Sequence, residues 1–420
     1  MKKILCALLF ISACLSGSPV SAQTTLDSLI AQAIKVSPKI KMLQAKLSAS
    51  EDMVPQVSNL PDPMLTLGLM NLPTNSLSFT QEAMTGKIIG LSQKIPFPGK
   101  LSTMGKVSQK NADIVKEELD DAKNEIRKNV ASAYYELSFT RKAIAIENES
   151  CKLLKSIAEV VRTKYSVSTA SQQNLLKIEL EITKVNDKLD QLAEQESSQL
   201  AVLNSYLLKP SNSTLNVHEN FNIKFLSLTQ SELDSLARAN RPFLKGINIA
   251  EEKAALQKSL ADYDYYPNFS LGIQYTQRDR IAQTNMDLHD LVSFMVGISL
   301  PLNYGGKVSS KVEETESMKE LYMQQYNSSL QMLNANFGSA VSKLNTLKKR
   351  INLINNGLLP QAEQTYNAAL SSYQVGQIDF INVIDAENNL YKIHTDIYRL
   401  KTNYLKEVAA LEFLTGTKLN

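Results

Sequence analysis

The chain has 420 residues, 43% of them hydrophobic, and its 45 basic and 42 acidic side chains leave a formal net charge of +3. This near balance lacks the concentrated basic charge that nucleic-acid-binding proteins carry. No stretch of about 18 continuously apolar residues follows the N-terminus, so the sequence predicts no helical membrane span.

The first residues predict an export signal. Lys2 and Lys3 precede a short apolar run at 4–13, and small residues form a cleavage site that ends at Ala22. A second interpretation exists, because the four residues that end at Cys14 resemble a bacterial lipobox, and cleavage there would leave a lipidated cysteine. We favour cleavage after Ala22, which predicts a signal peptide at 1–22.

The next part of the chain predicts two helices and a β-hairpin. A first helix is expected at 26–34, and a second is expected to end before Pro55, because proline lacks the N–H that an interior helical residue donates. A strand at 64–70 and a return strand at 87–95 follow. Leucines alternate along the first strand, so the sequence predicts a β-hairpin at 64–95.

The longest element lies in the run 106–209, which contains neither glycine nor proline. Its apolar residues recur at steps of three and four, which is the heptad signal for long helices that pack along one seam. We expect helices at 100–165 and 171–208. At about 1.5 Å per residue the first would reach about 100 Å, which is too long for one globular core.

The second half repeats the plan of the first. Pro38 matches Pro242 at an offset of 204 residues, and Tyr165 matches Tyr373 at an offset of 208, so the offset grows only slightly between the two ends. Such self-similarity indicates two copies of one structural unit. The chain is therefore expected to divide into a signal peptide at 1–22, a first structural repeat with short equatorial helices at 23–209, and a second structural repeat at 210–420.

The second repeat is expected to hold a β-hairpin at 268–300 and long helices at 307–373 and 380–414. The turn between these helices is the segment from Tyr373 to Gly376. Residues that disfavour a regular helix interrupt the first of them, and a kink or a packing adjustment is expected there: Gly338, Gly357 and Pro360.

The strands of the second repeat alternate clearly between apolar and small or polar residues. Each is roughly 9 to 11 residues long, the length that crosses an outer membrane at a tilt. A half-buried soluble hairpin shows the same alternation, but export, repetition and the long helices favour membrane strands. The residues predicted to face lipid are Phe269, Leu271, Ile273, Tyr275, Phe294, Val296 and Ile298.

Four strands from one chain cannot close a membrane barrel. An open sheet edge facing lipid would leave backbone groups without partners, and single-chain barrels begin at about 8 strands. Several chains must therefore contribute: two copies would supply about 8 strands and three about 12, and periodicity does not choose between them. The helices would continue such a barrel as a tube, which makes the assembly a conduit.

Over nearly all of its mature length the chain resembles the TolC-like outer-membrane efflux proteins. The matching stretches include GLSQKIPFPGK at 90–100, YQVGQIDFINVIDAENNL at 373–390 and LEFLTG at 411–416. The resemblance implies a mainly α fold with a small β part: a long α-helical coiled-coil barrel, with four strands per chain joining a trimeric β-barrel of roughly 12 strands.

The same resemblance implies a homotrimer in the cell outer membrane and its lipid, with a periplasmic helical tunnel. It further implies a periplasmic adaptor protein and an inner-membrane pump of the RND type as partners. The hairpin sequence LPDPMLTLGLMNLP at 60–73 resembles the branch associated with heavy-metal efflux. The alternatives are a conduit for drugs or other small molecules and a periplasmic coiled-coil scaffold, although a scaffold would not explain the two alternating hairpins.

The family motif also points to candidate site residues near the last helix. Asp385 matches one of two acidic positions in the family's periplasmic gate, and Asn382 stands at the other, so the gate is expected to carry less charge here. The alternative for Asp385 is an ordinary solvated carboxylate. Tyr373, Gly376 and Tyr165 match or parallel the helix tips that dock the adaptor, or they simply shape the turns. The tip at Tyr165 lacks glycine and is expected to be built differently.

The sequence predicts no closed metal site, no cofactor and no enzymatic activity. Its histidines, His218, His289 and His394, lie far apart, and Cys151 is isolated on a helical stripe. Nucleotide-binding loops and nucleophile motifs are absent from the sequence. Thioethers suit Cu(I), but methionine is also an ordinary packing residue, and those near the hairpins are Met64, Met70, Met84, Met286 and Met295.

Overall fold

The computed structural model describes residues 25–217 and 223–419. The predicted export signal and Cys14 lie outside these residues. The described chain forms two compact units, which we treat separately. Unit 1 consists of Met1–Ile40, Ala122–Ala237 and Asn334–Asn420, and unit 2 consists of Lys41–Asp121 and Arg238–Leu333. Each unit takes residues from both halves of the sequence. The expected fold class, mainly helical with a small β part, is confirmed.

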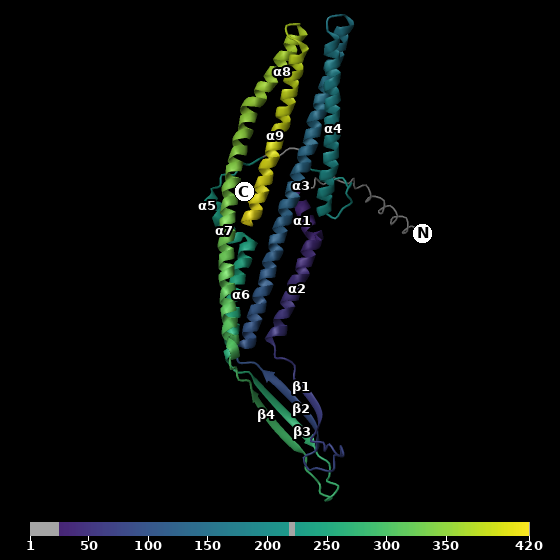
Figure 1. The fold of residues 1–420 in the computed structure, drawn as a ribbon. Coiled ribbons are helices and arrows are strands. Elements are labelled where there is room, and N and C mark those ends of the chain that lie inside the picture. Colours follow the sequence, from purple (N-terminus) through teal and green to yellow (C-terminus); the bar gives the residue numbers. More distant parts are fainter. Residues whose placement is uncertain (1–24, 218–222, 420) are drawn as a thin grey trace, which may run out of the picture. The chain divides into compact units, whose positions relative to one another are not determined.

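Unit 2 contains one antiparallel sheet (Figure 1). Its strands pair in the order β1-β2-β3-β4. The register places Leu67 opposite Ile89, Ile89 opposite Tyr275, and Tyr275 opposite Val292. The strand bounds are β1 Met64–Met70, β2 Gly86–Ile95, β3 Phe269–Gln277 and β4 Leu291–Ile298.

The apolar alternation expected for the second hairpin extends across all four strands. Because paired residues point to the same side of a sheet, the register gathers most of the large apolar residues on one face, which also carries Lys87 and Gln93. The other face holds mainly small or polar residues, together with Ile88 and Met295. The apolar face is bare within the chain: Leu67 is 69% exposed and Phe294 is 79% exposed. All seven residues predicted to face lipid lie on this face, and six of them are 42% or more exposed.

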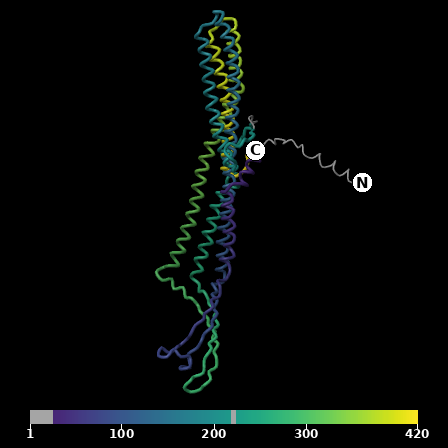
Figure 2. The backbone as a smooth tube through the Cα atoms, turned by 90° about the vertical axis from the view of Figure 1, so that its right-hand side faces the viewer, coloured from purple at the N-terminus to yellow at the C-terminus, as the bar shows by residue number. Residues whose placement is uncertain are grey.

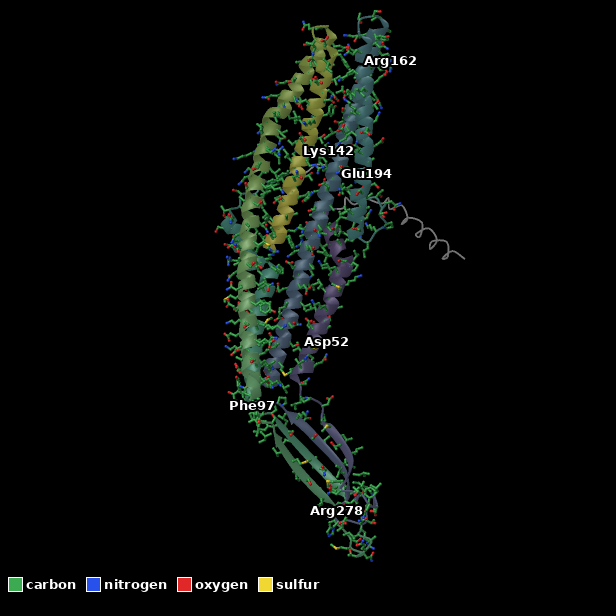
Figure 3. All side chains as sticks on the ribbon, viewed as in Figure 1. Asp52, Phe97, Lys142, Arg162, Glu194 and Arg278 are labelled. Carbon is green, nitrogen blue, oxygen red and sulfur yellow. The ribbon has the colours of Figure 1, made fainter. Side chains whose placement is uncertain are left out.

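Each end of the sheet is held by side-chain contacts, polar at one end and aromatic at the other. At the loop end, Arg278 donates from its backbone N–H to Asp290 at 2.9 Å and from its guanidinium to the carbonyl of Ala83 at 3.2 Å. At the other end, Phe97 stacks on Tyr266 with ring centroids 4.6 Å apart. Figure 3 labels Phe97 where β2 leads into α3, and Arg278 just after β3.

The helices of unit 2 include α2 Pro38–Ser58, α6 Pro242–Asp262 and the parts of α3 and α7 that belong to this unit. The expectation that Pro55 ends the second helix was wrong, because α2 continues to Ser58. Proline removes the usual donor to the carbonyl of Glu51. Pro55 and Glu51 are both exposed, so solvent reaches this part of α2. Lys46 pairs with Glu118 at 2.7 Å across the α2–α3 contact.

Unit 1 is helical in its described residues. Its elements, some of which extend beyond the unit, are α1 Leu26–Val36, α3 Lys100–Ser166, α4 Gln172–Tyr206, α5 Gln230–Asn240, α7 Lys307–Leu353, the π-helix η3 Ile354–Leu358, α8 Leu359–Gln374 and α9 Phe380–Thr415. Its main core cluster joins α3, α4, α8 and α9 through buried residues such as Leu154, Ile178, Tyr366 and Val383. Among the described residues, no helix has the length and apolarity that a membrane span requires.

The glycines and the proline expected to disturb the seventh helix behave differently from one another. A packing adjustment occurs at Gly357 and Pro360, where the π-helix precedes α8. No break occurs at Gly338, where α7 continues. A Cβ at Gly338 would lie 3.4 Å from the side chain of Gln230, and Gln230 donates to the carbonyl of Asn334 at 3.1 Å. Gly338 therefore lies beside the start of α5, in a space where a Cβ would make an ordinary contact.

Candidate functional site at the helix turns

Unit 1 carries two helical hairpins whose turns lie at the same end (Figure 1 and Figure 2). One turn joins α3 to α4, and the other joins α8 to α9. Every candidate gate and docking residue from the sequence, namely Tyr165, Tyr373, Gly376, Asn382 and Asp385, lies in or next to one of these turns. The fold therefore gathers residues that are separated by about 200 positions.

The two turns share their longest backbone hydrogen bond, but the first tip is built differently in two details. Ala170 donates a further bond to the carbonyl of Lys164 at 3.2 Å. The Ser171 side chain accepts from the backbone of Asn174 at 3.3 Å, whereas Asp379 at the equivalent place makes no such cap. Thr169 donates to the carbonyl of Lys164 at 2.8 Å, and Gln377 donates to the carbonyl of Ser372 at 2.9 Å. This long bond is typical of a helix that ends on a left-handed residue. That residue is Ser168 in the first turn, with φ 61°, and Gly376 in the second, with φ 77°.

Exchanging these two residues is expected to change stability in opposite directions. A left-handed backbone costs a non-glycine residue roughly 1 kcal/mol, and nothing lies within 4 Å of a Cβ at Gly376, so backbone conformation alone decides the effect. We expect Gly376→Ser to lower the free energy of unfolding by about 1 kcal/mol and Ser168→Gly to raise it by about 0.5 kcal/mol. Denaturant unfolding of both variants would measure this, and equal signs would contradict it.

Tyr373 is part of the core at the turn. It is 7% exposed, and its ring packs on Phe380 with centroids 5.2 Å apart. Lys164 of α3 lies 4.4 Å from the centre of the Tyr373 ring and donates to the Tyr373 carbonyl at 3.2 Å. This position joins the two hairpins. Tyr165, by contrast, is 42% exposed and remains accessible in the chain.

Two exposed apolar residues at the turns were missed by sequence reasoning. Val167 follows α3 and is 63% exposed, and Val375 follows α8 and is 70% exposed. They precede the left-handed residues Ser168 and Gly376 by one position in each turn. Their equivalent places in the repeat, at the same offset of 208 residues as Tyr165 and Tyr373, were the signal that would have found them.

Asn382 and Asp385 lie in the first turns of α9. Both side chains are exposed, whereas Val383 and Ile384 between them are fully buried. Residues three apart on a helix share a face, so Asn382 and Asp385 form one polar stripe beside the turn. Asn382 donates to the carbonyl of Asp379 from its backbone at 3.1 Å. The stripe is available to solvent or to another chain.

A buried acid on the opposite face of α9 was also missed. Glu387 has no exposed surface, and Ser150 of α3 donates to its Oε1 atom at 2.5 Å. Burial raises the pKa of Glu387 to about 7, the hydrogen bond from Ser150 opposes this shift, and the charges of Glu147 and Glu181 add to it. Its place in the heptad series of Val383 and Leu390 was the sequence signal for burial.

A second polar link joins α3 to α9 further from the turns. The carboxylate of Glu136 accepts hydrogen bonds from Arg399 and, at 3.0 Å, from Lys406. The Arg399 guanidinium also lies 3.6 Å from the centre of the Phe139 ring. Burial opposes ionisation of Glu136, but the hydrogen bonds from both cations lower its pKa below the usual value.

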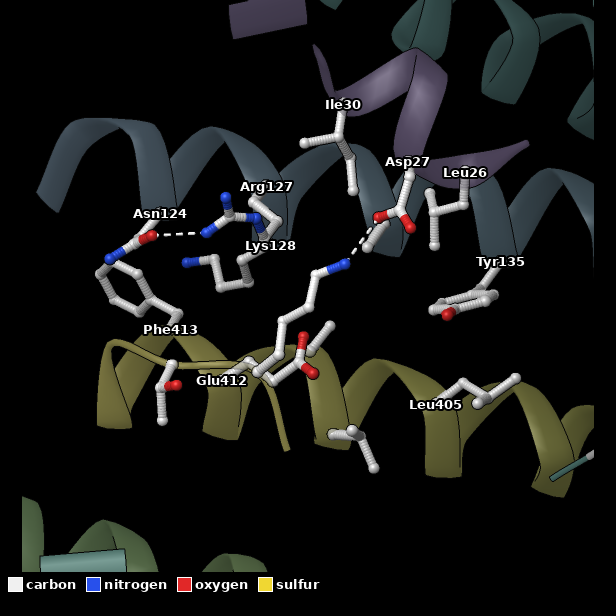
Figure 4. A pocket seen from close by; sticks show the side chains of 15 residues that line it. Leu26, Asp27, Ile30, Asn124, Arg127, Lys128, Tyr135, Leu405, Glu412 and Phe413 are labelled. Atoms are coloured by element: carbon white, nitrogen blue, oxygen red, sulfur yellow. Dashed lines mark hydrogen bonds and ion pairs between the residues drawn. The ribbon is translucent and has the colours of Figure 1, made fainter. Parts of the chain in front are cut away.

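A cavity of about 170 Å³ lies between α1, α3 and α9. Lys418 pairs with Asp27 at 2.9 Å. Arg127 donates to Asn124 at 2.6 Å, as a dashed line in Figure 4 marks. These charges are therefore already satisfied within the chain. None of the candidate gate or docking residues lines this cavity. In the described part of the chain, no group of three or more His, Cys, Asp or Glu side chains is arranged to hold a metal ion.

Comparison with known proteins adds an independent line of evidence. A family model described as "Outer membrane efflux protein" matches residues 29–207 and 233–417. An uncharacterized protein of Haemophilus influenzae is 24% identical over 265 residues, which cover 61% of this chain and 58% of that protein. "Outer membrane efflux protein BepC" of Brucella suis is 20% identical, covering 99% of this chain and 90% of its own.

A metal-resistance protein is among the relatives. "Cobalt-zinc-cadmium resistance protein CzcC" of Cupriavidus metallidurans is 19% identical, covering 88% of this chain and 84% of that protein. The crystal structure of the outer membrane protein VceC from Vibrio cholerae aligns with a TM-score of 0.77 at 18% identity, covering 94% of this chain and 97% of that one. At this low identity, the similarity to VceC shows a shared fold.

Proposed function

Because the chain belongs to the outer membrane efflux protein family, we propose that it is the outer-membrane channel of a tripartite efflux system. It would conduct substrates passively from a periplasmic adaptor and an inner-membrane pump, of the RND type, to the exterior. The observation that carries this proposal is the bare apolar face across β1 to β4. A soluble protein rarely exposes so continuous an apolar surface, and lipid is the partner that suits it.

Assembly from several chains follows from the edges of the sheet. Within one chain β1 and β4 each pair on one side only, and an unpaired edge in lipid leaves backbone groups without partners. Pairing of β1 with β4 of another copy removes both edges. We propose a homotrimer, in which three copies supply roughly 12 strands.

We also propose that the chain arose from the two structural repeats at 23–209 and 210–420. Helices α1 and α5 are both 11 residues long, α2 and α6 are both 21 residues long, and each pair is related by the same offset of 204 residues. The two tips share a long backbone hydrogen bond and the left-handed residue that precedes its donor. Duplicated units explain these coincidences directly.

Asp385 and Asn382 are proposed to line the periplasmic mouth of the channel, and Tyr165, Tyr373 and Gly376 to belong to the tips that meet the adaptor. Exposure of the Asn382 and Asp385 stripe supports the first assignment. Burial of Tyr373 favours an indirect role for it, in which it holds the turn in shape. Exposed Tyr165 is the better direct contact.

The mouth assignment predicts a change in ion selectivity. Three carboxylates in a narrow opening attract cations, so Asp385→Ala is expected to lower the ratio of cation to anion permeability by about twofold or more. Single-channel recordings would measure the ratio. Asp396→Ala, which removes an exposed carboxylate further along α9, serves as the matched control, and an unchanged ratio in Asp385→Ala would remove this residue from the mouth.

Heavy-metal cations are the proposed cargo, and drugs or other small molecules are the alternative. The likeness to CzcC, a metal-resistance protein by its name, supports the first, and the hairpin sequence at 60–73 agrees with it. Growth of a deletion strain on copper, zinc and cobalt salts, beside a panel of dyes, detergents and antibiotics, would decide. Sensitivity to metals alone supports metal efflux, and sensitivity to the organic panel supports the alternative.

The channel itself is tested by a separate experiment on the assembled protein. A channel of this kind is expected to migrate as a heat-modifiable trimer in outer-membrane fractions. Recovery of the protein as a soluble periplasmic species would contradict the conduit and favour the coiled-coil scaffold.

A further inference from the structure

Glu387 is a buried carboxyl group at the contact between α9 and α3. It lies in the main core of unit 1, three residues after fully buried Ile384. Ser150 donates to one carboxyl oxygen, Oε1, at 2.5 Å. The other oxygen, Oε2, is buried and accepts no hydrogen bond from any residue that the structure describes. A carboxylate left half satisfied in a core is costly, whereas a neutral carboxylic acid is much less so.

The surroundings of Glu387 also disfavour its negative charge. The helices packed around it present acidic groups or tyrosines: Glu147 on α3, Glu181 on α4, Tyr366 on α8 and Tyr391 on α9 itself. Lysines on α4 act on these acids: Lys184 pairs with Glu181 at 3.0 Å, and the charge of Lys188 lowers the pKa of Glu147 against the effect of burial.

The hydroxyl of Tyr366 is a second unsatisfied group in the same core. It is buried and has no hydrogen-bond partner among the described residues. Burial raises the pKa of Tyr366, and the charge of Glu387 raises it further. Protonation of Glu387 removes a negative charge that is unfavourable in this core, where both its own Oε2 atom and the Tyr366 hydroxyl lack hydrogen-bond partners among the described residues.

We propose that Glu387 is a proton-binding site that controls the packing of α9 on α3. Protonated, it holds the α8–α9 hairpin against α3; ionised, it loosens this contact and favours movement of the hairpin. Because Asp385 and Asn382 lie on the same helix, within five residues of Glu387, the movement would open the proposed mouth. This last step rests on the proposed function, whereas the proton-binding site does not.

The raised pKa of Glu387 determines how the packing of α9 on α3 responds to pH. The pKa of Glu387 is raised from 4.5 to about 7 in the packed state, so packing is favoured below about pH 4.5 and loses this support as pH rises through about 7. If the loosened state exposes the carboxyl to water, its pKa there is the ordinary one. The opening equilibrium is then expected to rise about tenfold between pH 6 and pH 8.

Hydrogen exchange of the full-length protein tests the site. Segments 145–155 and 383–392 would be followed by mass spectrometry from pH 6 to pH 8, after correction for the intrinsic pH dependence of exchange. We expect about a tenfold rise in opening for the natural protein and none for Glu387→Gln, which mimics the protonated form. The matched control is Glu363→Gln, an exposed acid on α8, which should behave as the natural protein does.

A second variant separates proton binding from mere packing. Ser150 lowers the pKa of Glu387 through its hydrogen bond, so Ser150→Ala is expected to move the midpoint of opening to higher pH. A purely structural role for this contact would change the extent of opening at every pH without moving the midpoint. This variant also keeps the test valid if Glu387→Gln fails to fold.

Conductance in planar bilayers at the same pH values tests the link to the mouth. Higher open probability at pH 8, lost in Glu387→Gln, would support both parts of the proposal. Exchange that depends on pH without any conductance would leave the proton site standing and contradict the channel. Exchange that does not depend on pH in the natural protein, or that keeps its dependence in Glu387→Gln, would overturn the proposal.

Discussion

Phe294→Lys is expected to abolish assembly in the outer membrane, whereas Ser293→Lys is expected to be tolerated. Phe294 lies in the middle of β4 on the apolar face and is 79% exposed. Ser293, one residue earlier, lies on the opposite face, where it pairs with Gln274. A lysine facing lipid at mid-depth costs about 2–4 kcal/mol, and each chain of an oligomer bears this cost.

Comparison of the two variants tests which face of the sheet meets lipid, because both change the same strand. Both introduce the same charge into adjacent positions of one strand, so general effects on β-structure are matched. Heat-modifiable trimer in outer-membrane fractions is the measurement, with total protein as the reference. Equal loss in both variants would indicate that the apolar face does not meet lipid, and loss in Ser293→Lys alone would reverse the assignment of the faces.

Glu136→Ala is expected to be the most destabilising of the variants at polar contacts in unit 1. Glu136 is 14% exposed and accepts from both Arg399 and Lys406, which are each about one third exposed. Removal of the carboxylate leaves two partly buried cations without their partner. Fully buried pairs lose about 3–5 kcal/mol on such a change, and the partial exposure here reduces the expected loss to about 2 kcal/mol.

Denaturant unfolding at pH 7 and at pH 4 would measure this loss. The pKa of Glu136 is lowered in the folded chain, so its contribution is present above about pH 4.5 and falls as the pH drops through the lowered value. The deficit of Glu136→Ala should therefore be larger at pH 7. Glu159→Ala, which removes a partner from the exposed pair with Arg162, is the control and should cost less than about 0.5 kcal/mol.

Glu136 and Glu387 link the same two helices with opposite responses to pH. Glu136 supports the contact when ionised, and Glu387 supports it when protonated. Glu136 lies further from the turns than Glu387 does, as Arg399 and Lys406 follow Glu387 along α9. A rise in pH through 7 is therefore expected to loosen the turn end while the Glu136 link holds.

The long elements of this protein were predictable because their signals are local. Glycine and proline are absent from 106–209, and the apolar steps of three and four continue through the run, so helices near the observed α3 and α4 followed from the sequence. Alternation along β3 and β4 likewise identified the apolar face. The offset of 208 residues between Tyr165 and Tyr373 placed the two tips at equivalent positions of the repeat.

Expectations drawn from residue type alone failed where the surroundings of the residue decide the backbone conformation. Pro55 was expected to end a helix, but α2 continues to Ser58 along an exposed stretch where solvent reaches the backbone that proline leaves without a donor. Ser168 adopts the left-handed conformation that glycine prefers, and its turn has the same long backbone hydrogen bond as the turn at Gly376. Gly338 was expected to disturb its helix, but α7 continues through this residue.

The sequence by itself determined the helical and strand periods and the apolar face of the sheet, since each depends on spacing along the chain. Only the tertiary structure decided which polar residues are buried. Glu387 and Asp385 are two positions apart on one helix, yet one is enclosed by α3 and the core while the other faces solvent. Burial depends on partners more than 200 residues away, such as Ser150, and these partners set the free energy of each charge.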